Sequence, residues 1–162
     1  MVREATVENP PLARRPLDFK NEDEVAQEVN RLLSGGYRKA GNWDLAQMCD
    51  HLTAVMEGSL DGFRFGNWNW LWRRVLGPVA IRYVLWSRKM MQGLQCPDPS
   101  FCPTGNTPTA ESVRRFLEVL RRVETHTGPF KPHPALGNID AEQWRQIHLI
   151  HAAHHFSFLI PE

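Results

Sequence analysis

The sequence predicts an all-α protein, most simply an antiparallel bundle of four main helices. Apolar residues recur at helical spacing in several segments, and typical helix caps or breakers stand between these segments. No segment of strand length alternates apolar and polar residues, and no internal repeat is visible. With 162 residues, 42% of them hydrophobic and 23% charged, residues 1–162 are expected to form a single domain.

The N-terminal third is expected to contain an arm and two helices. Prolines within residues 1–20 disfavour a helix and predict an extended arm that lies along the bundle or stays mobile. A first helix is expected from Asn21 to the stop at Gly35–Gly36. A second begins with Asn42 as its cap and fades between Gly58 and Gly62.

The rest of the chain is expected to contain a third helix, or a broken pair of helices, and then two further helices. The third helix or broken pair spans Trp68 to about Gly93 and is expected to kink or break at Gly77–Pro78. A proline-containing loop over 94–107 then leads to Thr107, expected to cap the next helix. A second loop over 128–138 leads to a last helix that begins after Asp140 and ends near Leu159.

The last predicted helix contains a dense histidine cluster. His148, His151, His154 and His155 fall within eight residues. At about 100° per residue, His148, His151 and His155 lie within about 60° of one another, whereas His154 points well away from His155. Residues four apart have side chains one above the other, so His151 and His155 can direct ring nitrogens at one point.

A third ligand has to come from another helix. His51 is the best candidate, because it lies within an apolar stripe that must face the bundle interior. Three imidazoles with an open position suit zinc, nickel or a related divalent ion, and leave room for water or substrate. The alternative is that the histidines fill a helix face and hydrogen-bond to one another without a metal.

Several motifs along the chain resemble the DinB-like superfamily of four-helix-bundle proteins, and more closely an uncharacterised bacterial branch of it. The resemblance covers most of the chain. Its motifs are Arg15–Leu17, Gly41–Leu45 leading to His51–Leu52, Ser59–Phe63, His133–Pro134 with Gly137, Trp144, and His148–Leu159.

The resemblance implies a DinB-like fold and a metal site. In that superfamily, one histidine of the second helix and a His-x-x-x-His pair of the last helix commonly bind nickel or zinc. These positions correspond to His51, His151 and His155. Members include thiol-dependent transferases and isomerases that use low-molecular-weight thiols, while many relatives have no assigned activity.

Two further histidines are candidates for proton transfer or for supporting the site. His148 shares a helix face with the pair, and His133 lies in the loop before the last helix. As alternatives, His148 is a surface residue and His133 has no role at the site.

The segment from Trp68 to Lys89 is aromatic and basic, with no acidic residue. Such a helix can bind anions or a membrane surface, but it is more typical of a core helix covered by basic side chains or of a dimer interface. Cys49 is expected in the core, and Cys96 and Cys102 as surface thiols in the proline-rich loop.

The charge and the N-terminus limit the classes of function. A net charge of +1 gives no basic excess for nucleic-acid binding. Arginines interrupt the longest apolar stretch, so no membrane span is expected. An odd cysteine count and the lack of a signal peptide predict a cytoplasmic protein.

The sequence thus predicts a metal-dependent enzyme acting on a small molecule, either a hydrolase or a thiol-dependent transferase. The alternatives are a non-catalytic metal-binding or protein-interaction bundle, including a homodimer, and a metal-free bundle.

Overall fold

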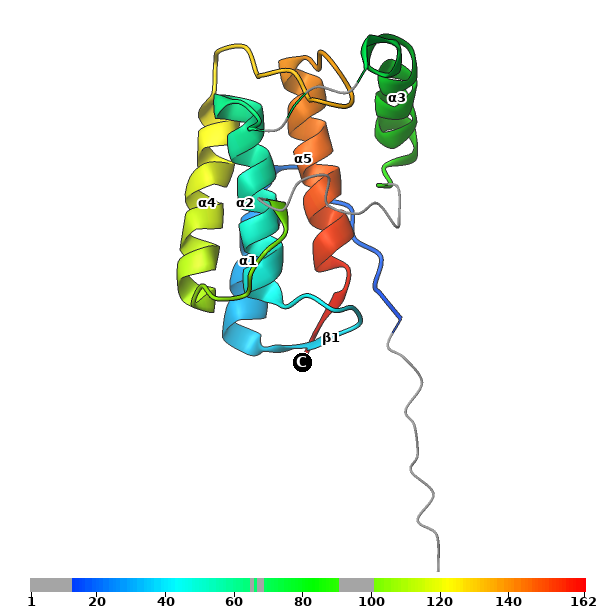
Figure 1. The fold of residues 1–162 in the computed structure, drawn as a ribbon. Coiled ribbons are helices and arrows are strands. Elements are labelled where there is room, and N and C mark those ends of the chain that lie inside the picture. Colours follow the sequence, from blue (N-terminus) through cyan, green and yellow to red (C-terminus); the bar gives the residue numbers. More distant parts are fainter. Residues whose placement is uncertain (1–12, 65, 67–68, 91–100) are drawn as a thin grey trace, which may run out of the picture.

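The structure is a computed structural model that describes residues 13–64, 66, 69–90 and 101–162. Within these ranges the chain is mostly helical, with five α-helices, a short π-helix and a small two-stranded sheet (Figure 1). Helices α2, α4 and α5 pack in a bundle-like arrangement, and α1 contacts α4 and α5.

The first two helices begin at residues whose side chains cap them. Helix α1 spans Glu22–Gly35 and begins where predicted, and the Asn21 side chain accepts a hydrogen bond from the backbone of Glu24. Helix α2 spans Leu45–Asp61. The prediction of Asn42 as its cap was wrong, because Asp44 forms a reciprocal capping box with Gln47.

The predicted interruption at Gly77–Pro78 is a change of helix type. A π-helix, η1, spans Trp72–Leu76 and continues directly into α3, Gly77–Ser87. Pro78 is the second residue of α3, and because proline has no N–H it cannot donate to a carbonyl of the preceding helical turn. The predicted start at Trp68 lies outside the described residues, whereas α3 ends at Ser87, earlier than the predicted end near Gly93.

The last two helices follow the predicted order with shifted ends. Helix α4 spans Thr109–Thr125, and its cap position is Pro108, not the predicted Thr107. Helix α5 spans Ala141–Phe156 and begins after Asp140, as predicted, with a capping box of Asp140 and Gln143. It ends before Leu159 because the chain then becomes extended.

That extended segment corrects the prediction of a purely helical chain. Strand β2, Leu159–Pro161, pairs antiparallel with β1, Tyr37–Lys39, so that Arg38 faces Ile160. Each strand has three residues, too few for a recognisable alternation. The pairing fixes the segment after α5 against the chain that follows α1.

The helix directions differ from a strictly antiparallel bundle. Helices α2 and α4 run in the same direction, as Figure 1 shows and as the ion pair of Asp61 with Arg122, near their C-terminal ends, requires. Helix α5 runs opposite to α2, which places His51 beside His151 and Ser59 beside His148. The shared direction of α2 and α4 is possible because a long segment containing α3 joins them.

The core lies between these helices. Its fully buried large side chains come from all four long helices, and they include Leu32, Leu52, Met56, Phe116, Trp144 and Phe156. Cys49 is fully buried, as expected, and burial raises the pKa of its thiol. Cys102 is exposed, whereas Cys96 lies outside the described residues.

The segment of η1 and α3 stands beside the bundle (Figure 1) and contacts the loop before α5 through its backbone. A β-carbon added at Gly77 would lie 2.5 Å from the carbonyl oxygen of Leu136. A β-carbon at Gly137, where φ is +81°, would lie 2.7 Å from the carbonyl oxygen of Arg73. These two close approaches require glycine and hold the start of α3 in place.

The N-terminal arm was expected either to lie along the bundle or to stay mobile. Its described part lies along the bundle. The backbone N–H of Arg15 donates to Ser157, and its guanidinium contacts the Leu159 carbonyl and the Glu28 carboxylate. Residues 1–12 lie outside the described residues. None of the helices in the described ranges is both long enough and apolar enough to cross a membrane.

Candidate metal centre

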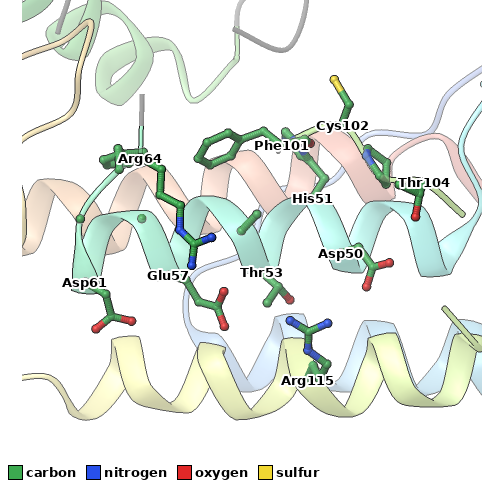
Figure 2. A pocket seen from close by; sticks show the side chains of 15 residues that line it. Asp50, His51, Thr53, Glu57, Asp61, Arg64, Phe101, Cys102, Thr104 and Arg115 are labelled. Carbon is green, nitrogen blue, oxygen red and sulfur yellow. Dashed lines mark hydrogen bonds between the residues drawn. The ribbon is translucent and has the colours of Figure 1, made fainter. Parts of the chain in front are cut away.

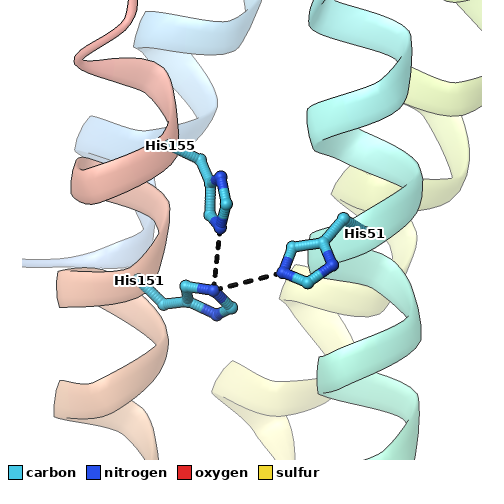
Figure 3. A group of neighbouring side chains, drawn as sticks. All are labelled: His51, His151 and His155. Carbon is cyan, nitrogen blue, oxygen red and sulfur yellow. Dashed lines mark hydrogen bonds between the residues drawn. The ribbon is translucent and has the colours of Figure 1, made fainter. Parts of the chain in front are cut away.

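Three histidines from two helices meet in the bundle. His51 comes from α2, and His151 and His155 come from successive turns of α5 (Figure 3). One ring nitrogen of each lies within 4.8 Å of the others, which makes a group that could hold a metal ion. The structure therefore brings together the three residues that the sequence singled out.

The nitrogens that meet are all Nε2 atoms. His151 Nε2 lies 2.9 Å from His155 Nε2 and 3.3 Å from His51 Nε2. The antiparallel directions of α2 and α5 and the four-residue spacing on α5 produce this convergence.

A backbone carbonyl fixes the orientation of His51. Its Nδ1 lies 2.7 Å from the carbonyl oxygen of Phe101, which can only accept a hydrogen bond. Nδ1 therefore has the hydrogen, and in the neutral ring Nε2 has a lone pair directed at His151. A hydrogen bond to the outer ring nitrogen is the usual way in which proteins orient a metal-binding histidine.

Hydrogen bonds among three neutral rings cannot give every Nε2 atom of the group a partner. If His151 Nε2 has a hydrogen, it can donate to His51 or to His155, but not fully to both. If it has none, its lone pair faces the lone pair of His51. A divalent cation accepts lone pairs from all three rings at once, so the donor set fits a metal ion.

Burial favours the neutral rings that metal binding requires. His51 and His151 are each 9% exposed. Desolvation lowers the pKa of both, and the nearby His155 lowers that of His151 further. Desolvation, with His51 and His154 nearby, lowers the pKa of His155 to about 2.

Trp43 packs against the group and was not singled out as a site residue from the sequence. Its ring stacks on His155 at a centroid distance of 5.4 Å and an interplanar angle of 11°, and lies 5.1 Å from His51. The available signal was its place in the Gly41–Leu45 motif, which is part of the resemblance described above. The Phe101 carbonyl had no sequence signal, because every residue has a carbonyl group.

A pocket of about 780 Å³ reaches His51. Figure 2 shows His51, Phe101 and Cys102 on one side of α2, with the carboxylates of Asp50 and Glu57 directed toward Arg115 of α4. Such a volume suits a small molecule. The acidic side chains therefore line the part of the pocket away from the three rings.

The two secondary candidates are not part of the three-histidine group. Ser59 donates its hydroxyl hydrogen to the Met56 carbonyl and therefore accepts from His148 Nε2, 2.9 Å away. His133 Nδ1 accepts from the backbone N–H groups of residues 135 and 136. Their proposed part in proton transfer stays a prediction.

His154, expected to point away from His155, has no nitrogen in the group. It is half-buried, and its ring contacts the edge of His155 at a centroid distance of 5.1 Å. It therefore offers a matched control for substitutions of the three group members.

The metal-free protein is expected to lose stability as the pH falls from about 6 to 4. Burial lowers the pKa of His148 from 6.5 to about 3, so this ring stays neutral in the folded state and becomes protonated on unfolding. Such a group makes the free energy of unfolding fall by about 1.4 kcal/mol per pH unit.

Urea unfolding with a chelator, across this pH range, measures the slope. His148→Gln is expected to make the free energy of unfolding less dependent on pH, by about the amount that one proton taken up on unfolding contributes. Equal slopes in the two proteins would contradict a neutral, buried His148.

Comparison with known proteins gives a family but no activity. The model of the family described as "Protein of unknown function (DUF1569)" matches residues 12–162, nearly the whole chain. No curated protein and no solved structure matches it. The chain therefore belongs to the DUF1569 family, and its last helix and three-histidine group lie within the matched region.

Proposed function

We propose that the protein is a divalent-metal-dependent enzyme of the DinB-like type, in which His51, His151 and His155 hold zinc or nickel. The convergence of three Nε2 atoms within 4.8 Å is the observation that supports this proposal. Both ions bind neutral imidazole well, and three protein ligands leave a position for water or substrate.

This donor set is compatible with two reaction classes. A bound divalent ion would supply Lewis-acid chemistry and lower the pKa of a water molecule or thiol beside it. The proposal is hydrolysis of a small molecule, or transfer involving a low-molecular-weight thiol. Both reactions need a nucleophile formed near neutral pH, and neither needs an acidic residue among the ligands.

The residues around the group would orient it and limit access to it. The Phe101 carbonyl holds the His51 ring, and Trp43 covers His155. The pocket that reaches His51 has the volume for a small substrate, and Arg115 in its lining offers a positive charge. Of the three histidines, His51 lines this pocket, and the proposal requires that a substrate reaches the ion from there, unlike in a closed structural metal site.

Metal analysis of protein purified without a histidine tag tests the proposal. Near-stoichiometric zinc or nickel is expected in the unaltered protein and almost none in a variant with both His151→Ala and His155→Ala. The metal-loaded protein is then assayed with activated esters and with a thiol plus an electrophile, using the double variant as the background.

Different results separate the parts of the proposal. Failure of the unaltered protein to bind either ion, even after reconstitution, would contradict the metal centre and favour packed histidines. Stoichiometric metal without turnover in either assay would favour the non-catalytic alternative.

A further inference from the structure

One helix exposes an unusual amount of apolar surface. Trp86 is 82% exposed and Val79 is 63% exposed, and both lie on α3. Almost all the large exposed apolar side chains of the described residues belong to α3 or to residues 70–76 before it, which we call the turn before α3. They are Trp70, Leu71, Trp72, Val75, Leu76, Val79, Tyr83 and Trp86. We call these eight residues the apolar face. Contact of these large apolar side chains with water is unfavourable, and such an exposed patch is typical of an interaction surface.

Within α3, the residues of the apolar face are opposite to the side of the helix that contacts the protein. At about 100° per residue, Val79, Tyr83 and Trp86 lie within about 60° of one another. Ile81 and Val84 are buried on the other side of the helix, which contacts α5. The helix thus has a second apolar side that the bundle does not use.

The segment that contains the apolar face has basic but no acidic residues. The sequence has no aspartate or glutamate from Gly62 to Pro97. Arg74, Arg82 and Lys89 are exposed. Beyond the end of α3, Lys89 also lines a second pocket, in which Arg14, Arg15 and Arg88 outnumber the one acid, Asp18. The partner of this surface is therefore expected to be negatively charged.

The helix is held firmly enough to present this face. The close backbone approaches at Gly77 and Gly137 fix its start. At its end, the Arg88 side chain donates to the Asp18 carboxylate, the Gln146 side chain and the Phe19 carbonyl. Exposure of the apolar face does not require any helix of the bundle to open.

We propose that α3 and the turn before it bind the surface of a negatively charged lipid bilayer, with the apolar face in the headgroup region. Tryptophan and tyrosine favour the membrane–water interface, and flanking cations are attracted to anionic lipids. Binding at the surface needs no membrane-crossing helix.

The charge argues against a second copy of this chain as the occupant. In a two-fold symmetric contact the same surface meets itself. The basic residues Arg74, Arg82 and Lys89 of one copy would then approach the same basic set of the other, with no acid of this segment to offset them. An anionic bilayer can contact the apolar side chains with its lipid and the basic side chains with its negatively charged headgroups.

Vesicle flotation tests the proposal with the full chain. Binding is expected to vesicles of phosphatidylcholine mixed with phosphatidylglycerol, but far less to phosphatidylcholine alone, and salt should weaken it. Arg74→Glu, Arg82→Glu and Lys89→Glu together are expected to reduce the partition coefficient by about a hundredfold or more. Val79→Glu with Trp86→Glu should also abolish binding, because it removes the inserted side chains.

Arg121→Glu provides the matched control, because Arg121 is a highly exposed arginine on α4, away from the apolar face. It should bind the mixed vesicles almost as well as the unaltered protein. Circular dichroism of each variant verifies that the helices remain folded.

Two results would overturn the proposal. One is no binding to the mixed vesicles at low salt. The other is a dimer, measured by light scattering, that the Val79→Glu and Trp86→Glu variant converts to monomer, because a second copy would then occupy the face.

Discussion

Replacement of His151 by alanine is expected to lower the affinity for zinc by roughly two to three orders of magnitude, one ligand's share of a typical protein–zinc binding free energy. His151 is the central member of the group, since its Nε2 contacts those of both His51 and His155. Its loss leaves two nitrogens that no third ligand joins. Competition with a chromophoric chelator measures the affinity directly.

His154→Ala is the matched control for this experiment. Its ring lies on the same helix and contacts His155, but it has no nitrogen in the group. Its zinc affinity is expected to stay within about tenfold of the unaltered value, as for a residue that touches a ligand without binding the ion. An equal loss in both variants would mean that helix packing, and not ligation, determines the affinity.

Replacement of Trp144 by alanine is expected to cost about 3–5 kcal/mol in the free energy of unfolding. Trp144 is 1% exposed and stacks on His148 at a centroid distance of 5.1 Å. Its indole N–H donates to the Lys131 carbonyl, which ties the loop before α5 to the helix. Alanine would leave a cavity and an unpaired carbonyl, and urea unfolding in the presence of a chelator measures the loss.

Trp86→Ala gives the contrast, since it removes the same side chain from a position that is 82% exposed. Its effect on the free energy of unfolding is expected to stay within about 0.5 kcal/mol. A large loss at Trp86, or a small loss at Trp144, would contradict the burial of the two side chains described above.

The helices could be predicted because their signals are local. The capping boxes at Asp44 and Asp140 and the glycines at Gly35–Gly36 lie within a few residues of the helix ends that they define. The error of two residues at Asn42 arose because both Asn42 and Asp44 are good caps, and Gln47 three residues after Asp44 was the deciding signal.

The site could be predicted in part for the same reason. The four-residue spacing of His151 and His155 is a helical property, so the sequence sufficed to place both on one side of α5. The participation of His51 was inferred from its apolar surroundings. It depended on α2 and α5 running in opposite directions, and the structure has that arrangement.

Pairing between distant segments could not be predicted. Strands β1 and β2 have three residues each and are separated by more than a hundred positions, so neither shows a pattern by itself. The exposure of Trp86 was equally hidden, because an apolar residue on a helix is normally buried.

The sequence alone determined where helices form, that Asp140 caps the last of them and which histidines share a face, because neighbouring residues decide these properties. Only the tertiary structure determined that α2 and α4 run in the same direction, that the Phe101 carbonyl orients His51 and that α3 leaves an apolar face exposed. Each of these depends on contacts between segments far apart in the chain, and such contacts follow from packing of the whole molecule.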